Sequence, residues 1–122
     1  MTRINPAVAP DLALEWIQKN QKQINTHPAW HGNISEKDSE ILLNNEGSFI
    51  YLLRSGEKRH SYFISFVKKD GSIQHQSFTL ELDQKGWQYR NGSTINYNDL
   101  NKLIPLMMHC DPASCNPLRV LN

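Results

Sequence analysis

Residues Phe49–Ser55 read Phe-Ile-Tyr-Leu-Leu-Arg-Ser, five apolar side chains followed by a guanidinium and a hydroxyl. Apolar residues occupy both alternating positions, so the segment predicts a central strand that is buried on both faces. Arg54 at the end of such a strand is partly removed from water, and an unpaired buried cation strongly destabilises a fold. Because the strand contains no acidic residue, Arg54 requires either a distant carboxylate or an anion bound from outside.

The residues after Arg54 predict an antiparallel meander of strands. A loop at Gly56–His60 separates two apolar segments, and Lys69–Ser72 contains the Asp-Gly pair that is typical of a tight hairpin. The segment after this hairpin mixes polar with apolar residues, as expected for a strand with one exposed functional face. A weaker strand then leads into a polar turn. The expected strands are Phe49–Arg54, Ser61–Val67, Ile73–Leu80 and Trp87–Arg90, and the polar turn is Asn91–Thr94.

A helix rich in polar residues is predicted near the N-terminus. Asp11 can cap it, and Leu12 and Trp16 lie four residues apart on one helical face. Residues Asn25–Pro28 end it, because a residue before a proline is disfavoured in the helical conformation. Gln, Lys and Asn cover its other side. We therefore predict an N-terminal helical extension at residues 1–28, either docked or solvated, and a domain at residues 29–122.

A second helix is predicted just before the apolar strand. Ser35 with an acid at Asp38 resembles a capping box, and the apolar residues that follow are expected to face the core. The helix should end near Asn44. Its expected apolar face consists of Ile41, Leu42 and Leu43.

A third helix follows the strands. It is expected to start near Asn98, and Pro105 inside it predicts a kink or a late start. Its apolar residues at helical spacing are Leu100, Leu103, Ile104 and Met107. The order helix, meander, helix predicts an α+β fold, in which a central antiparallel sheet is flanked by two helices and an extra helix precedes them.

Composition limits the classes of function. The chain has 122 residues, 39% hydrophobic and 20% charged, with a formal net charge of +1. This length suits one domain with one core, and the small net charge argues against general attraction to nucleic acids or membranes. No apolar run has the length of a transmembrane helix or the form of a signal peptide. We expect a soluble, cytoplasmic monomer in which Cys110 and Cys115 are reduced thiols.

Several short motifs occur in a recognisable order along the chain. They are Trp30–Ser35, Ser39–Leu43, Tyr51–Ser55, Tyr62–Ser65, His75 and Tyr97–Ile104. In this order they resemble a Src homology 2 domain, with a match that spans roughly Trp30 to Leu118. The resemblance implies a module that binds phosphotyrosine in a short peptide, acting as an adaptor or competitor for tyrosine-phosphorylated proteins. It implies no catalysis and no cofactor.

By this resemblance, Arg54 binds the phosphate. A planar guanidinium can bind two phosphate oxygens at once, and phosphotyrosine carries about −1.5 to −2 charges. Only a long phosphotyrosine side chain would reach an arginine below the sheet surface. The loop after Arg54 would wrap the phosphate, and His75 would pack beside the arginine. The implied phosphotyrosine site comprises Arg54, Ser55, Gly56, Glu57, Lys58, Arg59, Lys37, His75 and Ser77.

The sequence departs from the family pattern at several positions. Gly56 stands where a serine is usual, Glu36 where an arginine is common, and Ser77 where a lysine is frequent. Either Lys37 or the cations of the following loop must compensate for Glu36, so Arg54 is expected to carry a large share of phosphate recognition. The groove for neighbouring peptide residues is expected to involve Gln76, Tyr89, Met107, Asp111, Ala113 and Ser114. These departures, in a chain that is little more than one domain, resemble stand-alone Src homology 2 domains of intracellular bacteria, which act in host cytosol.

Two alternatives to phosphate binding keep the same fold. Arg54 could be a structural cation paired with a distant acid such as Glu40 or Glu57. The domain could also bind an unmodified peptide by adding a strand to a sheet edge.

A further alternative is a small zinc-binding protein. His109, Cys110 and Cys115 offer three possible ligands close together in the sequence. Their spacing matches no standard zinc pattern, and the adjacent residues His109 and Cys110 would point apart on a helix. Nucleophilic catalysis by either cysteine has no local motif to support it. We therefore predict no metal site and no enzymatic activity.

Overall fold

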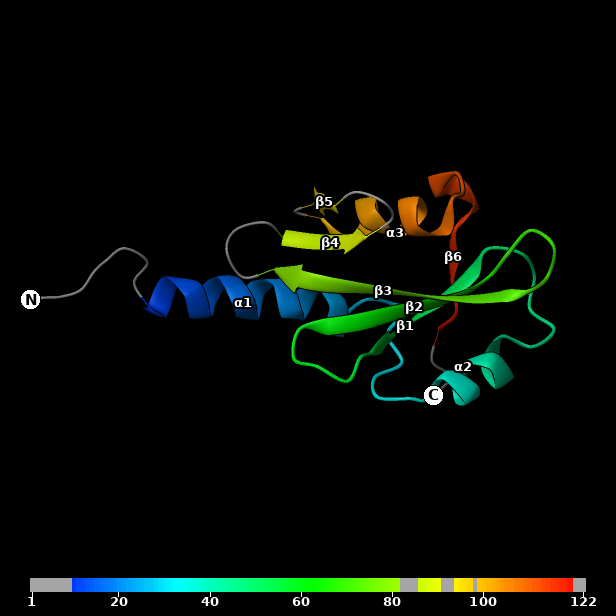
Figure 1. The fold of residues 1–122 in the computed structure, drawn as a ribbon, viewed down its shortest axis with the longest axis horizontal. Helices are drawn as coiled ribbons and strands as arrows, with labels where there is room; N and C mark the ends of the chain where they lie inside the picture. The colour runs from blue at the N-terminus through cyan, green and yellow to red at the C-terminus, as the bar shows by residue number, and fades with distance from the viewer. Residues whose placement is uncertain (1–9, 82–85, 91–93, 98, 120–122) are drawn as a thin grey trace, which may run out of the picture.

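The computed structural model describes residues 10–81, 86–90, 94–97 and 99–119 of the chain (Figure 1). The helices are α1 (Pro10–Asn25), α2 (Glu36–Leu43), α3 (Leu100–Met108) and the short 3-10 helix η1 (Pro112–Ser114). The strands are β1 (Ile50–Ser55), β2 (Ser61–Val67), β3 (Ile73–Glu81), β4 (Gly86–Arg90), β5 (Thr94–Tyr97) and β6 (Asn116–Pro117). No helix in these described ranges is long and apolar enough to cross a membrane.

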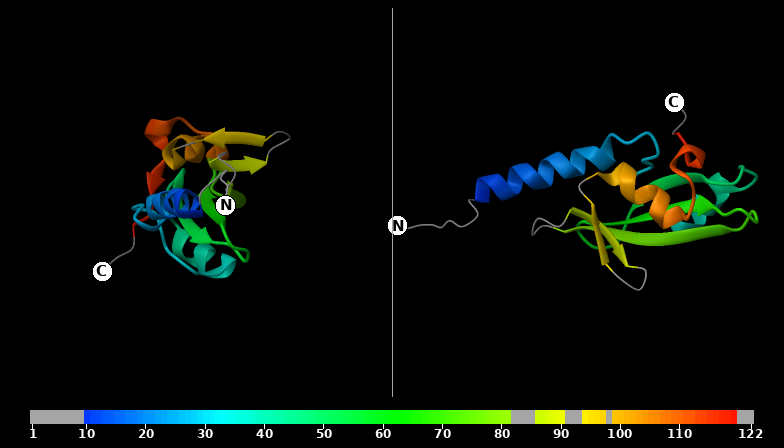
Figure 2. Two further views of the ribbon diagram at one scale, coloured as in Figure 1. Left: turned by 90° about the vertical axis from the view of Figure 1, so that its left-hand side faces the viewer. Right: turned by 90° about the horizontal axis from the view of Figure 1, so that it is seen from above.

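The strands form one sheet in the order β5-β4-β3-β2-β1-β6. All neighbours are antiparallel except β6, which lies parallel to β1. Helix α2 lies on one side of the sheet and α3 on the other, while α1 extends beyond the end of the sheet (Figures 1 and 2). The predicted α+β architecture, with a central sheet between two helices and an extra N-terminal helix, is confirmed.

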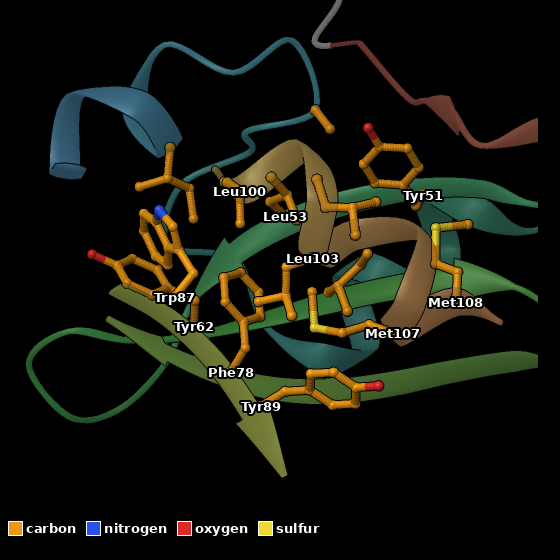
Figure 3. Close-up of a cluster of buried hydrophobic side chains, with 14 of the residues drawn as sticks. Tyr51, Leu53, Tyr62, Phe78, Trp87, Tyr89, Leu100, Leu103, Met107 and Met108 are labelled. Carbon is orange, nitrogen blue, oxygen red and sulfur yellow. The ribbon is translucent and has the colours of Figure 1, made fainter. Parts of the chain in front are cut away.

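Strand β1 contributes to a separate apolar cluster on each face of the sheet. Tyr51 and Leu53 belong to the larger cluster, with α3 and the end of α1 (Figure 3). Leu52 belongs to the smaller one, where it packs with Leu43 of α2 and Val67 of β2. Alternate side chains of a strand point to opposite faces, so the continuous apolar run is the expected signature of this position.

The edge of β1 that faces away from β2 is covered by two short segments. Its first residues pair with β6. Further along, the Leu53 amide donates to the Ala29 carbonyl and the His31 amide donates to the Leu53 carbonyl, both at 2.9 Å. The Ser55 amide donates to the Gly32 carbonyl at 3.0 Å. A peptide that adds a strand to this sheet would therefore have to use another edge.

The C-terminal end of α1 is part of the larger core. Ile24 is fully buried there, and the Gln23 side chain accepts two hydrogen bonds from distant elements. The Trp87 indole N–H donates to Gln23 Oε1 at 2.7 Å, and the Leu100 amide at the start of α3 donates to the same oxygen at 2.8 Å. This end of α1 is docked on the sheet and on α3. The predicted division at residue 28 remains a prediction.

The prediction for the apolar face of α2 was largely wrong. Ile41 is 64% exposed and Leu42 is 42% exposed. The helix instead turns Ser39 and Leu43 toward the sheet, and both are buried. These two residues are four apart and therefore share one face of this short helix. Ser35 caps the helix as predicted, since its hydroxyl accepts a hydrogen bond from the Asp38 amide.

The structure also differs from the prediction at strand β5 and at the start of helix α3. Thr94, assigned to a polar turn, begins strand β5, which pairs antiparallel with β4. Helix α3 begins at Leu100 with Asp99 as its cap, slightly later than expected, and Pro105 lies within it. Asn98 lies outside the described residues.

The prediction of two reduced cysteines was wrong. Cys110 and Cys115 form a disulfide, because the turn through η1 brings their Cα atoms to 6.8 Å. Both sulfur atoms are bonded to each other, so neither is available as a thiolate ligand. The zinc alternative built on His109 and these cysteines therefore loses two of its three ligands.

Candidate functional site

Arg54 is buried at the end of β1, with 5% of its surface exposed. Its Nε donates to the hydroxyl of Ser65 at 3.1 Å, and its Nη2 lies 3.4 Å from Nδ1 of His75. The guanidinium also lies over the ring of Phe63, 4.5 Å from the ring centre. Burial lowers the pKa of Arg54, whereas the negative charges of Glu36 and Glu40 raise it.

A chain of hydrogen bonds extends from Arg54 to the surface of α2. Ser65 Oγ lies 2.7 Å from His75 Nδ1, and His75 Nε2 lies 2.9 Å from Glu40 Oε2. The Ser65 hydroxyl and the Arg54 Nη2 group are both donors close to His75 Nδ1, which favours Nδ1 as the acceptor. In that arrangement His75 carries its proton on Nε2 and donates it to Glu40. Within the described residues no carboxylate forms an ion pair with Arg54, and Glu40 is reached only through this chain.

Arg54 also lines a pocket of about 380 Å³ on the same side of the sheet as α2. The pocket is enclosed by the segment that leads into α2, by the end of β1 and the loop after it, and by one residue of β2. Its lining residues are Asn33, Ile34, Ser35, Glu36, Arg54, Ser55, Gly56, Glu57 and Phe63. A buried cation in the lining of an open pocket is an arrangement that suits an anionic group on a long side chain.

The loop after β1 is closed by Ser61 and leaves no space for a side chain at residue 56. The Gly56 amide donates to the Ser61 carbonyl at 2.9 Å. A Cβ atom at residue 56 would lie 2.5 Å from Ser61 Oγ and 3.0 Å from two backbone atoms of Ser61. The Ser61 hydroxyl donates to the Lys58 carbonyl at 2.6 Å and accepts from the Lys58 amide at 3.0 Å. Gly56 is therefore required by the close approach of Ser61.

The structure places some of the predicted phosphate-site residues in the pocket and others outside it. Four of them line it and a fifth contacts Arg54 directly, whereas the remainder are exposed and do not line it. The lining residues are Arg54, Ser55, Gly56 and Glu57, the contacting residue is His75, and the exposed residues are Lys37, Lys58, Arg59 and Ser77.

The sequence interpretation missed several residues that shape the site, including Asn33, Phe63 and Ser65. Asn33 lines the pocket, and Phe63 and Ser65 contact Arg54. Ser65 had a signal in the sequence, because it is a hydroxyl within the apolar strand β2 and is fully buried. A buried hydroxyl in such a strand requires a hydrogen-bond partner.

The structure places the six predicted groove residues in two regions of the described chain. Tyr89 and Met107 are buried in the larger core, and Gln76 is half-buried on β3. Asp111, Ala113 and Ser114 are exposed around η1. A second pocket of about 400 Å³ lies between the outer face of α3 and η1, and its lining residues are Asn101, Lys102, Pro105, Leu106, Cys110 and Pro112. None of the six predicted groove residues belongs to it.

Glu36, Glu40 and His75 are the residues that could hold a metal ion in the described part of the chain. Their ligand atoms lie within 4.8 Å of one another. The hydrogen bond from His75 to Glu40 accounts for most of this proximity, and Glu36 follows from helical spacing, one turn before Glu40. The grouping alone does not indicate a metal site.

Comparisons with known proteins agree with the fold. The sequence model of the SH2 (Src homology 2) domain family matches residues 30–106. The chain is 30% identical over 111 residues to the "SH2 domain-containing protein 4A" of Xenopus tropicalis, covering 84% of this chain and 24% of that protein. It therefore spans about a quarter of the length of this relative.

A solved structure has a similar fold at low sequence identity. It is the solution NMR structure of the SH2 domain of the CRK/CRKL homolog from Monosiga brevicollis, with a TM-score of 0.57 and 19% identity. The match covers 78% of this chain and 89% of that domain. SH2 domains are, as a family, binding modules without catalytic activity that recognise tyrosine-phosphorylated peptides. The match of the family model over most of the chain, supported by this fold, shows that the chain belongs to the SH2 domain family.

Proposed function

We propose that this protein binds phosphotyrosine-containing peptides and that Arg54 binds the phosphate with two parallel hydrogen bonds. The observation that carries this proposal is a buried arginine, with only 5% of the residue's surface exposed, at the wall of an open pocket. It has no carboxylate ion partner among the described residues. A buried cation of this kind gains most from an anion that enters the pocket.

The contacts of Arg54 also fix the orientation of its guanidinium. Ser65 holds Nε, His75 lies beside Nη2, and the ring of Phe63 supports the plane. An arginine has five N–H donors, so these contacts leave donors for a phosphate. Because the group is already ordered, less conformational entropy is lost when the phosphate binds.

The depth of Arg54 supports phosphotyrosine over phosphoserine. A phosphate on a short side chain would stay near the pocket mouth, whereas an aromatic ring carries its phosphate further into the pocket. The pocket wall also contains Phe63 and Ile34, which can contact an aromatic ring.

We assign supporting roles to the other predicted residues. Lys37, Lys58 and Arg59 are exposed cations near the pocket in sequence, and they attract the phosphate without contributing to the pocket lining. Ser77 lies further along β3 from His75. The six predicted groove residues contact the peptide on either side of the phosphotyrosine.

The protein itself acts as a monomeric, non-enzymatic adaptor or competitor for tyrosine-phosphorylated proteins. It acts in the cytoplasm, as is typical of SH2 domains, and has no nucleic-acid or membrane partners.

Calorimetric titration with one peptide in three forms tests this proposal. The phosphotyrosine form should bind, and the unphosphorylated and phosphoserine forms should bind at least about tenfold more weakly, as expected for the loss of one hydrogen bond to a charged group. Arg54→Lys should cause a similar loss, because an ammonium cannot replace the planar fork. Arg119→Lys, at an exposed arginine, is the matched control and should bind as the unaltered protein does. Equal binding of the phosphorylated and unphosphorylated forms would contradict the proposal.

A further inference from the structure

The loop between β1 and β2, residues 56–60, forms part of the wall of the Arg54 pocket through its first two residues. Residues 57–59 are exposed, whereas His60, the last residue of the loop, is half-buried. Hydrogen bonds with Ser61 close the loop upon itself. The position of this part of the pocket wall therefore depends on what holds the chain where the loop joins β2.

His60 holds this junction in an unusual backbone conformation. Its φ of 61° lies in the left-handed region, which is uncommon for residues other than glycine and costs free energy. Contacts with the surrounding structure must support such a conformation. The His60 carbonyl accepts a hydrogen bond from the Leu80 amide of β3 at 2.9 Å, and the His60 side chain contacts helix α1.

The contact with α1 is made by Gln21. Its Nε2 lies 3.3 Å from His60 Nδ1, and because an amide nitrogen can only donate, the imidazole nitrogen accepts. Burial raises the pKa of Tyr62, and a hydrogen bond with the Gln21 side chain opposes this rise. Tyr62 belongs to the larger apolar cluster. Gln21 therefore links a buried side chain of β2 with the end of the pocket loop.

Helix α1 is itself fixed at this end, so it can support the loop. Gln23 accepts hydrogen bonds from β4 and from the start of α3, and Ile24 is fully buried. The loop between β1 and β2 lies at the same end of the sheet as α1 (Figure 1). Gln21 precedes residues 30–106, which match the family model. One support of the pocket loop thus comes from outside the region that defines the family.

We propose that Gln21 is a positioning residue for phosphotyrosine binding, because through His60 it holds the loop at residues 56–60 in the conformation that forms the pocket wall. This proposal rests on the proposed function. A loop that is already ordered loses less conformational entropy when a phosphate binds. Without the contact from α1, the phosphate itself would have to order the loop, and the affinity would fall.

Titration with a phosphotyrosine peptide and with phenyl phosphate tests the proposal. Gln21→Ala should weaken the binding of both by about fivefold, as expected for the loss of one hydrogen bond. Phenyl phosphate has no flanking residues, so an equal loss for both ligands assigns the effect to the pocket. Gln18→Ala, at an exposed position of the same helix, is the control and should bind as the unaltered protein does. Each titration is made well below the melting temperature of the variant, so that lower stability alone does not change the measured affinity.

A double-mutant cycle with His60 separates positioning from a general structural role. His60→Asn removes the imidazole, and asparagine tolerates a positive φ. This substitution should also weaken phosphotyrosine binding by about fivefold. The double variant should lose no more than either single variant, because both substitutions remove the same contact. Independent effects would instead multiply to about 25-fold.

Three outcomes would overturn the proposal. The first is an unchanged phosphotyrosine affinity in Gln21→Ala. The second is a pair of losses that multiply in the double variant. The third is a loss for the peptide without a loss for phenyl phosphate. Each of them leaves the proposed function intact if the unaltered protein still binds the phosphotyrosine peptide in preference to its unphosphorylated form. Failure of the unaltered protein to distinguish these two forms would contradict the proposed function.

Discussion

The Nε atom of Arg54 donates to the hydroxyl of Ser65 on the neighbouring strand, 3.1 Å away. The two residues are not opposite each other, because Arg54 pairs with Phe63 and Ser65 pairs with Leu52. The bond runs diagonally across the face that α2 covers. His75 is opposite Ser65 on the next strand, so the strand register places Arg54, Ser65 and His75 on one face of the sheet.

Ser65→Ala should therefore weaken phosphotyrosine binding although Ser65 does not line the pocket. The substitution removes the partner of a buried charged donor, which should lower the free energy of unfolding by about 1–3 kcal/mol. It should also reduce affinity by about fivefold, because the guanidinium is no longer held in one orientation. Thermal unfolding and peptide titration measure the two effects. Ser48→Ala, at an exposed serine, is the control. Unchanged affinity in Ser65→Ala would show that the hydrogen bond does not orient Arg54.

Gly56→Ala should destabilise the fold. Its Cβ would lie 2.5 Å from Ser61 Oγ and 3.0 Å from the Ser61 backbone, so the loop must shift. We expect a loss of about 1–3 kcal/mol in the free energy of unfolding, as for other overpacked sites. Adding Ser61→Gly should not restore stability, because the contacts with the Ser61 backbone remain and the two hydrogen bonds between the Ser61 hydroxyl and Lys58 are lost. Gly47→Ala is the matched control, since a Cβ at that residue meets no atom within 4 Å. Equal stability of both alanine variants would refute the packing argument.

His27 should make stability depend on pH. Its Nδ1 accepts from the Ala29 amide at 3.1 Å, so Nε2 carries the proton and donates to Asn101 Oδ1 at 2.9 Å. Burial lowers the pKa of His27 below 6.5, with a smaller opposing effect from the Asn101 hydrogen bond. The unfolded chain then binds the proton at a higher pH than the folded chain does, so stability is lost as pH falls below about 6.5.

Thermal unfolding of His27→Gln between about pH 5 and pH 7.5 measures this contribution. The melting temperature of the variant should depend less on pH than that of the unaltered protein. His109→Asn is the control, because His109 is exposed and has a positive φ of 54° that asparagine tolerates. Identical pH profiles for His27→Gln and the unaltered protein would exclude a role for this histidine.

Gln23→Ala should destabilise the domain although Gln23 lies before the region that matches the family. Its side-chain oxygen accepts from the buried Trp87 indole and from the Leu100 amide. Leaving two donors without a partner should cost about 2–4 kcal/mol of the free energy of unfolding. Gln18→Ala, on an exposed position of the same helix, is the control. Urea unfolding that gives equal stabilities for the two variants would support the prediction that residues 1–28 are a separable extension.

The sequence predicted the strands best where the apolar pattern was strong. Strand β2 has the predicted bounds Ser61–Val67, because two-sided burial and a hairpin with Asp-Gly both limit it. Strand β5 was missed, because its residues Thr94–Tyr97 form a strand through pairing with β4 and lack an apolar run of their own. The exposure of Ile41 could not be predicted, because helical spacing alone does not show which face of a short helix meets the sheet.

For the site, the sequence identified the buried cation but not its environment. Arg54 was evident, because a charge at the end of an apolar strand is unusual. Ser65 and Phe63 were not, because their contacts with Arg54 depend on the register between β1 and β2. The fit of Gly56 against Ser61 likewise depends on how the intervening loop closes.

The cover over the outer edge of β1 bears on the solubility of the chain. An apolar strand with an open edge is a template on which other chains can add strands and form aggregates. Here the cover comes from residues 29–32 and from β6, a strand of two residues near the other end of the described chain. During synthesis β1 emerges before β6, so the start of its outer edge stays uncovered until residues 116–117 have been made and have folded back. In that interval we expect this edge to be able to pair with strands of other chains.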